Sequence, residues 1–162
     1  MEQSRYIEAV DAYGNMVFRI ACNYCKCTAD AEDIVQNVFL KLYQAKTEFQ
    51  DEEHMKRWLI RVTANEAKNL VGSFWKKHMV SLEETGTEQS FDFPYPESSD
   101  LYDAVMELPE KYRIVMYLYY YEDYSVKEIA EILHLRETTV QTQLMRGRNK
   151  LKITLKEAWQ DE

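Results

Sequence analysis

A group of small polar side chains beside an arginine lies near the C-terminal end of the sequence. Threonine and glutamine side chains both donate and accept hydrogen bonds, and an arginine can donate two parallel bonds to one guanine edge. Such side chains suit the base edges that DNA exposes in its major groove. At helical spacing they share one face, whose members are Thr138, Gln141, Thr142, Met145 and Arg146.

The stretch from Ser125 to Leu151 supplies the elements that would position this face. Ser125 and Glu128 have the spacing of a capping box, which predicts the start of a short helix with an apolar stripe. After a turn at residues 134–136, a second helix would bury one face at steps of four, three and four residues. That buried face is formed by Val140, Leu144, Gly147 and Leu151. The pattern predicts a helix-turn-helix.

A plain amphipathic pair of helices with a solvated polar face has the same periodicity, so periodicity alone does not decide between the two. The charge pattern favours DNA, because residues 124–160 carry seven Lys or Arg against four Asp or Glu in a chain of net charge −8. The pI of about 5.0 argues against binding through charge alone. We therefore expect DNA binding through local patches, or beside a partner that supplies positive charge.

The composition favours an all-α protein. The 162 residues are 46% hydrophobic and suffice for one or two domains, and only four Gly and three Pro occur among long stretches of helical period. No apolar stretch is long enough to cross a membrane, and residues 1–12 lack the order of a signal peptide. We expect a cytoplasmic protein without membrane insertion.

No catalytic constellation is visible in the sequence, so we expect neither enzymatic activity nor a cofactor. There is no glycine-rich phosphate loop and no nucleophile beside a matching base. Cys22, Cys25 and Cys27 form a cluster, but zinc takes four ligands, so His54 or His78 would have to complete the site. We expect no metal and free thiols, with thiol or metal sensing as an alternative.

An acidic stretch divides the chain into two modules. Between His78 and Glu110 there are nine Asp or Glu and no Lys or Arg. The Gly, Pro and Ser residues of 83–100 are typical of an extended linker. We expect a helical bundle at residues 1–77, an acidic flexible linker at 78–100, and a second bundle with the helix-turn-helix at 101–162. The linker is either a solvated spacer or an acidic strand that lies in a basic channel of a partner or shields the DNA-binding face.

The N-terminal module is expected to hold three or four helices. Thr28 is placed to cap the second helix, and a third is expected to begin near His54 with Trp58 turned inward. In the C-terminal module, Pro109 marks a helix start. Residues 115–121 have some strand character, but their spacing favours a helix.

Three segments resemble extracytoplasmic-function sigma factors, which are subunits of bacterial RNA polymerase. Residues 31–39 (AEDIVQNVF) are similar to the polymerase-binding segment of that family, and residues 58–65 (WLIRVTAN) to the segment that opens the promoter. The sequences LPEKYR, EIAEIL and TVQ after them resemble its DNA-reading module. The resemblance covers nearly the whole chain. It implies a transcription initiation factor that binds core RNA polymerase and promoter DNA and is silenced by an anti-sigma factor.

The resemblance also implies roles for individual residues. The second helix would bind the polymerase clamp through Asp33, Gln36, Asn37 and Lys41. The third helix and the loop before it would capture the melted downstream promoter element through Phe49, His54, Lys56, Arg57, Arg61, Asn65, Lys68 and Asn69. The helix-turn-helix would read the upstream element with Thr138, Gln141, Thr142, Met145 and Arg146, while Arg136, Arg148 and Lys150 lie nearer the phosphates.

Three functions have different consequences. A sigma factor needs core polymerase to bind its promoter. A free-standing helix-turn-helix regulator binds duplex DNA alone, in a salt-sensitive manner. A thiol- or metal-responsive sensor changes its activity when the three cysteines are replaced by serine.

Overall fold

The computed structural model describes residues 1–25, 27–77 and 100–160, so the expected acidic linker at 78–100 lies almost entirely outside the described residues. The chain divides into two compact units, residues 1–95 and residues 96–162. All regular structure in the described parts is helical, which confirms the predicted all-α class. None of these helices combines the length and apolar character that a membrane crossing requires.

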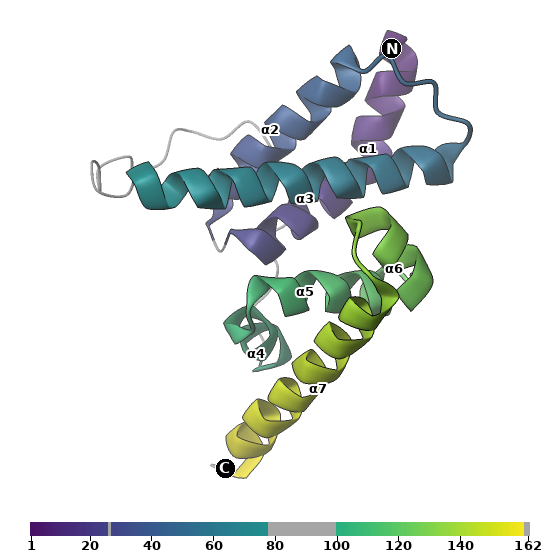
Figure 1. Ribbon diagram of the computed structural model, residues 1–162. Coiled ribbons are helices and arrows are strands. Elements are labelled where there is room, and N and C mark those ends of the chain that lie inside the picture. The colour runs from purple at the N-terminus through teal and green to yellow at the C-terminus, as the bar shows by residue number, and fades with distance from the viewer. Residues whose placement is uncertain (26, 78–99, 161–162) are drawn as a thin grey trace. The chain divides into compact units, whose positions relative to one another are not determined.

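The first unit is a bundle of three helices, α1 (Gln3–Tyr24), α2 (Thr28–Gln44) and α3 (Glu52–Lys77), each of which packs on the other two (Figure 1). Helix α2 contributes an apolar stripe to the core of the bundle. Its members, all buried, are Ile34, Val35, Val38, Phe39 and Leu42. Burying these side chains removes a broad apolar surface from water, which is the main force that closes the bundle.

Of the two helix starts predicted in this unit, the first differs from the prediction and the second agrees with it. Thr28 does not cap α2, because the first turn closes one residue earlier, where the amide of Ala31 donates to the carbonyl oxygen of Cys27 at 3.0 Å. Helix α3 begins two residues before His54, and the side chain of Asp51 accepts a hydrogen bond from the amide of His54 at 2.7 Å. Trp58 is partly exposed rather than fully inside.

The second unit contains α4 (Asp100–Glu107), α5 (Glu110–Met116), α6 (Val126–Leu133) and the long α7 (Glu137–Gln160). Helices α4, α5 and α6 all pack on α7. Pro109 precedes the first residue of α5, so the predicted helix start is confirmed. Residues 115–121 are helical, as predicted.

Helix α5 continues into a π-helical turn, η1 (Tyr117–Tyr121). The amide of Glu122 donates to the carbonyl oxygen of Tyr117 at 3.2 Å, five residues back. This wider turn carries one more residue than an α-helical turn.

A buried arginine joins the first two helices of this unit. The Arg113 guanidinium, on a residue that is only 4% exposed, donates through Nη1 to the carbonyl oxygens of Met106 at 3.0 Å and Leu108 at 2.7 Å. These carbonyls lie at the C-terminal end of α4, where helix geometry leaves acceptors without partners. Arg113 therefore fixes the corner between α4 and α5.

Candidate polymerase and nucleic-acid interfaces

Helix α2 presents an exposed polar face opposite its buried stripe. Asp33, Gln36 and Asn37 are all exposed, as the sequence predicted. They lie within four residues of one another, so a partner helix laid across α2 could contact all three. Lys41 is exposed on the same helix, but its Nζ forms an ion pair with Glu66 of α3. It is therefore already engaged within the bundle.

Next to this face lies a buried carboxyl group that the sequence analysis missed. Glu32 is 5% exposed, and its Oε2 has no hydrogen-bond partner among the described residues. Burial raises the pKa of this carboxyl group, and the negative charge of Asp33 raises it further. The sequence signal was ambiguous, because a glutamate in the first turns of a helix is ordinarily a solvated partner of the helix dipole.

The loop before α3 is anchored by an aromatic cluster. Phe49 is 7% exposed, and its ring makes edge contacts with His54 at 5.3 Å and Trp58 at 5.6 Å between centroids. The amide of Gln50 also donates to His54 Nδ1 at 3.2 Å. The prediction had Phe49 in contact with DNA, but its ring is buried inside the protein. Its place in the structure is that of an anchor for the loop.

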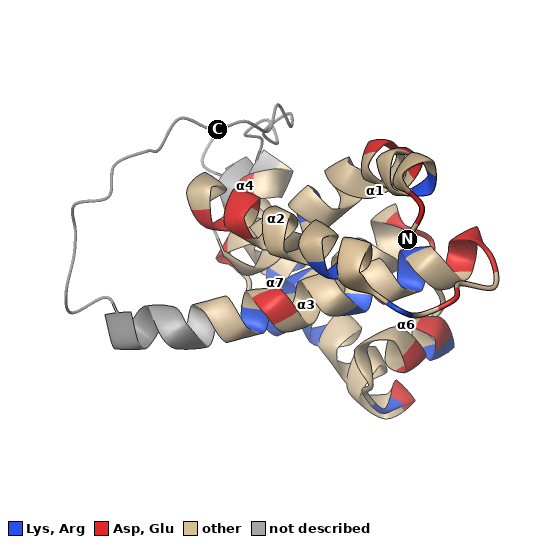
Figure 2. Cartoon of the chain, turned by 90° about the horizontal axis from the view of Figure 1, so that it is seen from above, with Lys and Arg blue, Asp and Glu red and all other residues tan. Residues whose placement is uncertain are grey.

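Helix α3 carries a row of basic and amide side chains, and basic residues recur along it in Figure 2. Arg61, Asn65, Lys68 and Asn69 are exposed, while Lys56 and Arg57 are partly buried. The Arg57 Nε donates to Glu53 Oε1 at 3.0 Å, one turn earlier. Residues 57, 61, 65 and 68 recur at steps of three or four, so they share one helix face.

The predicted helix-turn-helix is present in the second unit. The amide of Glu128 donates to Ser125 Oγ at 3.1 Å, and the amide of Ser125 donates to Glu128 Oε1 at 3.0 Å, so the capping box is confirmed. His134 ends α6 with a left-handed φ of 55°, which turns the chain before α7. The predicted buried face of α7 is also confirmed, since all four of its members are buried.

The opposite face of α7 is open to a partner. Thr138, Gln141, Met145 and Arg146 are exposed, as is Arg136 just before the helix. Thr142 is partly buried, and its hydroxyl donates to the carbonyl oxygen of Thr138 at 2.9 Å. The sequence had placed these side chains on one face, and the structure brings them together there.

Two basic residues predicted near phosphates are held by tyrosines. The Arg148 guanidinium lies 5.5 Å from the ring centroids of both Tyr119 and Tyr120, and its Nε donates to the Tyr120 hydroxyl. Lys150 Nζ lies 5.5 Å from the ring of Tyr112. These cation–π contacts restrict long side chains that would otherwise be mobile. Both side chains remain exposed.

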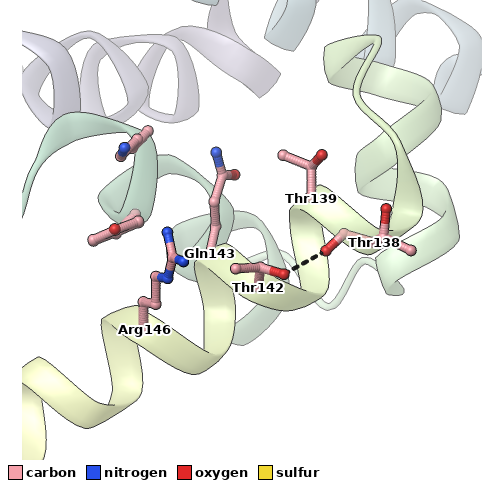
Figure 3. Close-up of a pocket in the computed structure, with 7 residues that line it drawn as sticks. Thr138, Thr139, Thr142, Gln143 and Arg146 are labelled. Atoms are coloured by element: carbon pink, nitrogen blue, oxygen red, sulfur yellow. Dashed lines mark hydrogen bonds between the residues drawn. The ribbon is translucent and has the colours of Figure 1, made fainter.

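A pocket of about 290 Å³ opens between α5 and α7, and we call it the α5–α7 pocket. Its wall on α7 is drawn in Figure 3 and consists of Thr138, Thr139, Thr142, Gln143 and Arg146. Lys111 and Tyr112 of α5 complete the lining. The sequence analysis missed Lys111, Tyr112 and Gln143 here, because helical periodicity does not show which distant helix covers a face.

The cysteines do not form a metal site in the structure. Cys22 and Cys25 are buried, and burial raises the pKa of each thiol to about 12. Cys27 is exposed. No group of metal-ligating side chains with suitable geometry occurs within residues 1–25, 27–77 and 100–160. A thiol held in the protonated form reacts slowly, so Cys22 and Cys25 are poorly reactive in the folded protein.

Two family models match the chain. A model described as Sigma-70 region 2 matches residues 9–76, and one described as Sigma-70, region 4 matches residues 98–151. The first match covers most of the bundle of α1 to α3, and the second covers most of the unit that holds the helix-turn-helix.

Known sigma factors are similar over almost the whole chain. The ECF RNA polymerase sigma factor SigW of Bacillus subtilis (strain 168) is 27% identical over 171 residues, which cover 96% of this chain and 91% of SigW. The RNA polymerase sigma factor SigV of the same organism is 31% identical over 144 residues, covering 85% of this chain and 83% of SigV.

Solved structures share the fold. The sigma factor RpoE from Bartonella quintana, in complex with the anti-sigma factor NepR, superposes with a TM-score of 0.71 at 19% identity, over 94% of this chain and 97% of RpoE. CnrH, in complex with the cytosolic domain of CnrY, gives a TM-score of 0.67 at 20% identity, over 96% of this chain and 90% of CnrH. The chain belongs to the extracytoplasmic-function sigma factors of RNA polymerase and directs that enzyme to promoters.

Proposed function

We propose that the two units divide the work of promoter selection. The unit at residues 1–77 binds core polymerase and melts the downstream promoter element, and the unit at residues 101–162 reads the upstream element as duplex. The acidic segment at 78–100 links them. The chain acts in the cytoplasm without a catalytic step of its own, because the polymerase supplies the chemistry.

Polymerase binding is assigned to the exposed polar face of α2. The observation that carries this proposal is the pairing of a fully buried stripe with three exposed polar residues, Asp33, Gln36 and Asn37, on one short helix. An aspartate and two amides are suited to arginines on a partner helix, with which they form charge-assisted and neutral hydrogen bonds. Lys41 contributes after its ion pair with Glu66 is exchanged or extended.

The downstream element is assigned to α3 and the loop before it. Arg61, Asn65, Lys68 and Asn69 form the exposed contact row, with His54, Lys56 and Arg57 at the start of the helix. Basic and amide groups hold phosphates and base edges of a single strand, while a flipped base needs a shaped pocket. Phe49 fixes the loop that would bind such a base, through its ring contacts with His54 and Trp58.

The upstream element is assigned to α7 of the helix-turn-helix. Arg146 is the best donor to a guanine edge, at about 1–3 kcal/mol of discrimination against the wrong base. Thr138, Gln141, Thr142 and Met145 complete the reading face. Arg136, Arg148 and Lys150 hold the phosphates beside it.

An anti-sigma factor is the regulator that we propose for this chain. One of its structural neighbours, RpoE, was solved with the anti-sigma factor NepR, and another, CnrH, with the cytosolic domain of CnrY. Exposed apolar side chains on both units offer contact area for a protein partner, among them Leu40 and Tyr43 on α2 and Tyr121 at η1. Co-purification from the native host, followed by mass spectrometry, identifies it.

A pull-down with bacterial core RNA polymerase, followed by run-off transcription on genomic fragments, tests the proposed function. Asp33→Ala combined with Gln36→Ala should abolish both retention and transcription. Asp11→Ala, which removes an exposed carboxylate from α1, is the matched control and should leave both unchanged. Duplex binding without core polymerase would instead support the free-standing regulator. Loss of transcription in the triple Cys→Ser variant would support the sensor.

A further inference from the structure

We propose that the α5–α7 pocket holds a backbone phosphate of the upstream duplex, with Lys111 and Gln143 as two contacts beyond the reading face. The proposal rests on the assignment of α7 to the upstream element. It adds a residue from α5, outside the helix-turn-helix, to the DNA-binding surface.

The lining of the pocket has the chemistry of an anion site. Lys111 and Arg146 contribute two positive charges, three threonines contribute hydroxyl groups, and no carboxylate lines the pocket. Glu110 and Glu137, the acidic neighbours in sequence, are both absent from its lining. Such a gathering of cations is unusual in a chain of net charge −8. An anion placed there relieves the repulsion between the two cations.

A buried tyrosine ring draws the positive charges together. Lys111 Nζ lies 5.3 Å from the ring centroid of Tyr112, and Lys150 Nζ lies 5.5 Å from the same ring. Tyr112 is only 6% exposed, so its ring is a fixed platform. Lys111, which lines the pocket, is restrained there by this contact, whereas Lys150 lies about one helical turn beyond Arg146 and outside the lining.

Gln143 presents an unfilled hydrogen-bonding position at this site. Its side chain lines the pocket in Figure 3, and Oε1 is buried without a hydrogen-bond partner among the described residues. The Nε2 end of the same amide carries two hydrogens, which can donate to a phosphate oxygen in the pocket.

The shape of a helix in the major groove indicates DNA as the source of the anion. An α-helix with its side chains is about 10–12 Å wide, and the groove is about 12 Å wide, so phosphates flank the helix on both sides. Thr138, Thr142 and Arg146 belong both to the reading face and to the pocket. A duplex placed on the reading face therefore brings its backbone to the edge where α5 lies.

The test uses holoenzyme reconstituted from the full chain and core polymerase, on a promoter selected by run-off transcription. Each phosphate contact contributes about 0.9 to the slope of log K against log[salt]. Lys111→Gln should lower that slope by about 0.9, so its affinity falls about 3.5-fold less than that of wild type between about 50 and 200 mM salt. The affinity lost through Lys111→Gln should be the same on the promoter and on a version with altered upstream base pairs, because a phosphate contact does not depend on sequence.

Gln143→Lys and Lys156→Gln complete the design. Gln143→Lys adds a cation at the pocket, so the slope should steepen by about 0.9, a gain that misfolding cannot produce. Lys156→Gln removes an exposed lysine that lies about 15 Å beyond Arg146 along α7, and it should leave the salt slope unchanged. If Lys111→Gln and Gln143→Lys both leave the salt slope unchanged, the phosphate site is overturned. The proposed function still stands in that case, provided that wild-type holoenzyme selects the promoter. Weaker capture of a co-purified anti-sigma factor with unchanged DNA binding would assign the pocket to an acidic protein and also overturn it. Failure of wild-type holoenzyme to select any promoter would overturn both.

Discussion

Replacing Arg113 by methionine should destabilise the second unit more than any surface change in it. The substitution keeps a long apolar stem in a site that is 4% exposed, but it removes the guanidinium that donates to the carbonyl oxygens of Met106 and Leu108. Those carbonyls end α4 and begin the corner to α5. Without the donor, the corner loses the group that fixes it.

The magnitude follows from the two hydrogen bonds. A bond from a charged donor contributes about 1.5–3 kcal/mol, so the pair contributes at most about 6 kcal/mol. Part of this is offset, because methionine no longer requires a charge to be buried. We expect a net loss of about 2–4 kcal/mol. In a unit of this size, the smaller figure corresponds to a fall of at least about 8 °C in its Tm.

Calorimetry of the full chain measures the loss, and hydrogen exchange of the amides in α4 to α7 assigns it to the second unit. Lys152→Met, an exposed change of the same chemical kind, should stay within about 0.5 kcal/mol of wild type. Retention on core polymerase should persist, because that contact is assigned to α2 in the other unit. A loss below about 0.5 kcal/mol for Arg113→Met would refute the reasoning.

Three further outcomes are expected. Ser125→Ala removes the capping box of α6 and should cost the second unit about 1 kcal/mol in urea unfolding, whereas Ser125→Asp should retain most of it. Burial raises the pKa of Glu32, so the protonated carboxyl group is favoured in the fold and its stabilising effect is lost as pH rises through the folded pKa. Glu32→Gln should therefore be more stable than wild type at pH 7, with a difference that disappears below about pH 4.5; an equal difference at both pH values would contradict this. Thiol labelling of native protein should modify exposed Cys27 well before Cys22 and Cys25, and equal rates at all three would show that the first unit opens readily.

Local signals in the sequence predicted the helix-turn-helix well. The capping box at Ser125 and the apolar steps of α7 are properties of residues close together in the chain, and the structure confirms both. The polar face of α2 was predictable for the same reason. A helical period identifies which side of a helix is buried, and it does so without knowledge of the neighbouring helix.

Features that depend on contacts between distant residues were not predictable in this way. Lys111 and Gln143 line one pocket although 32 positions separate them, and no pattern in the sequence pairs them. The burial of Phe49 was not predictable for a related reason, since an aromatic residue in a polar loop fits a DNA contact and an anchor equally well. Thr28 was predicted as the N-cap of α2, whereas the N-cap is Cys27, one residue earlier. Helix boundaries are the least certain part of any sequence interpretation.

Helix α7 is one uninterrupted helix of 24 residues, about 36 Å long. The reading face proposed above lies within its first ten residues, and its last turns extend past Leu151, away from that face. Ile153 is exposed on this distal stretch, so a protein bound there would leave the proposed base contacts uncovered.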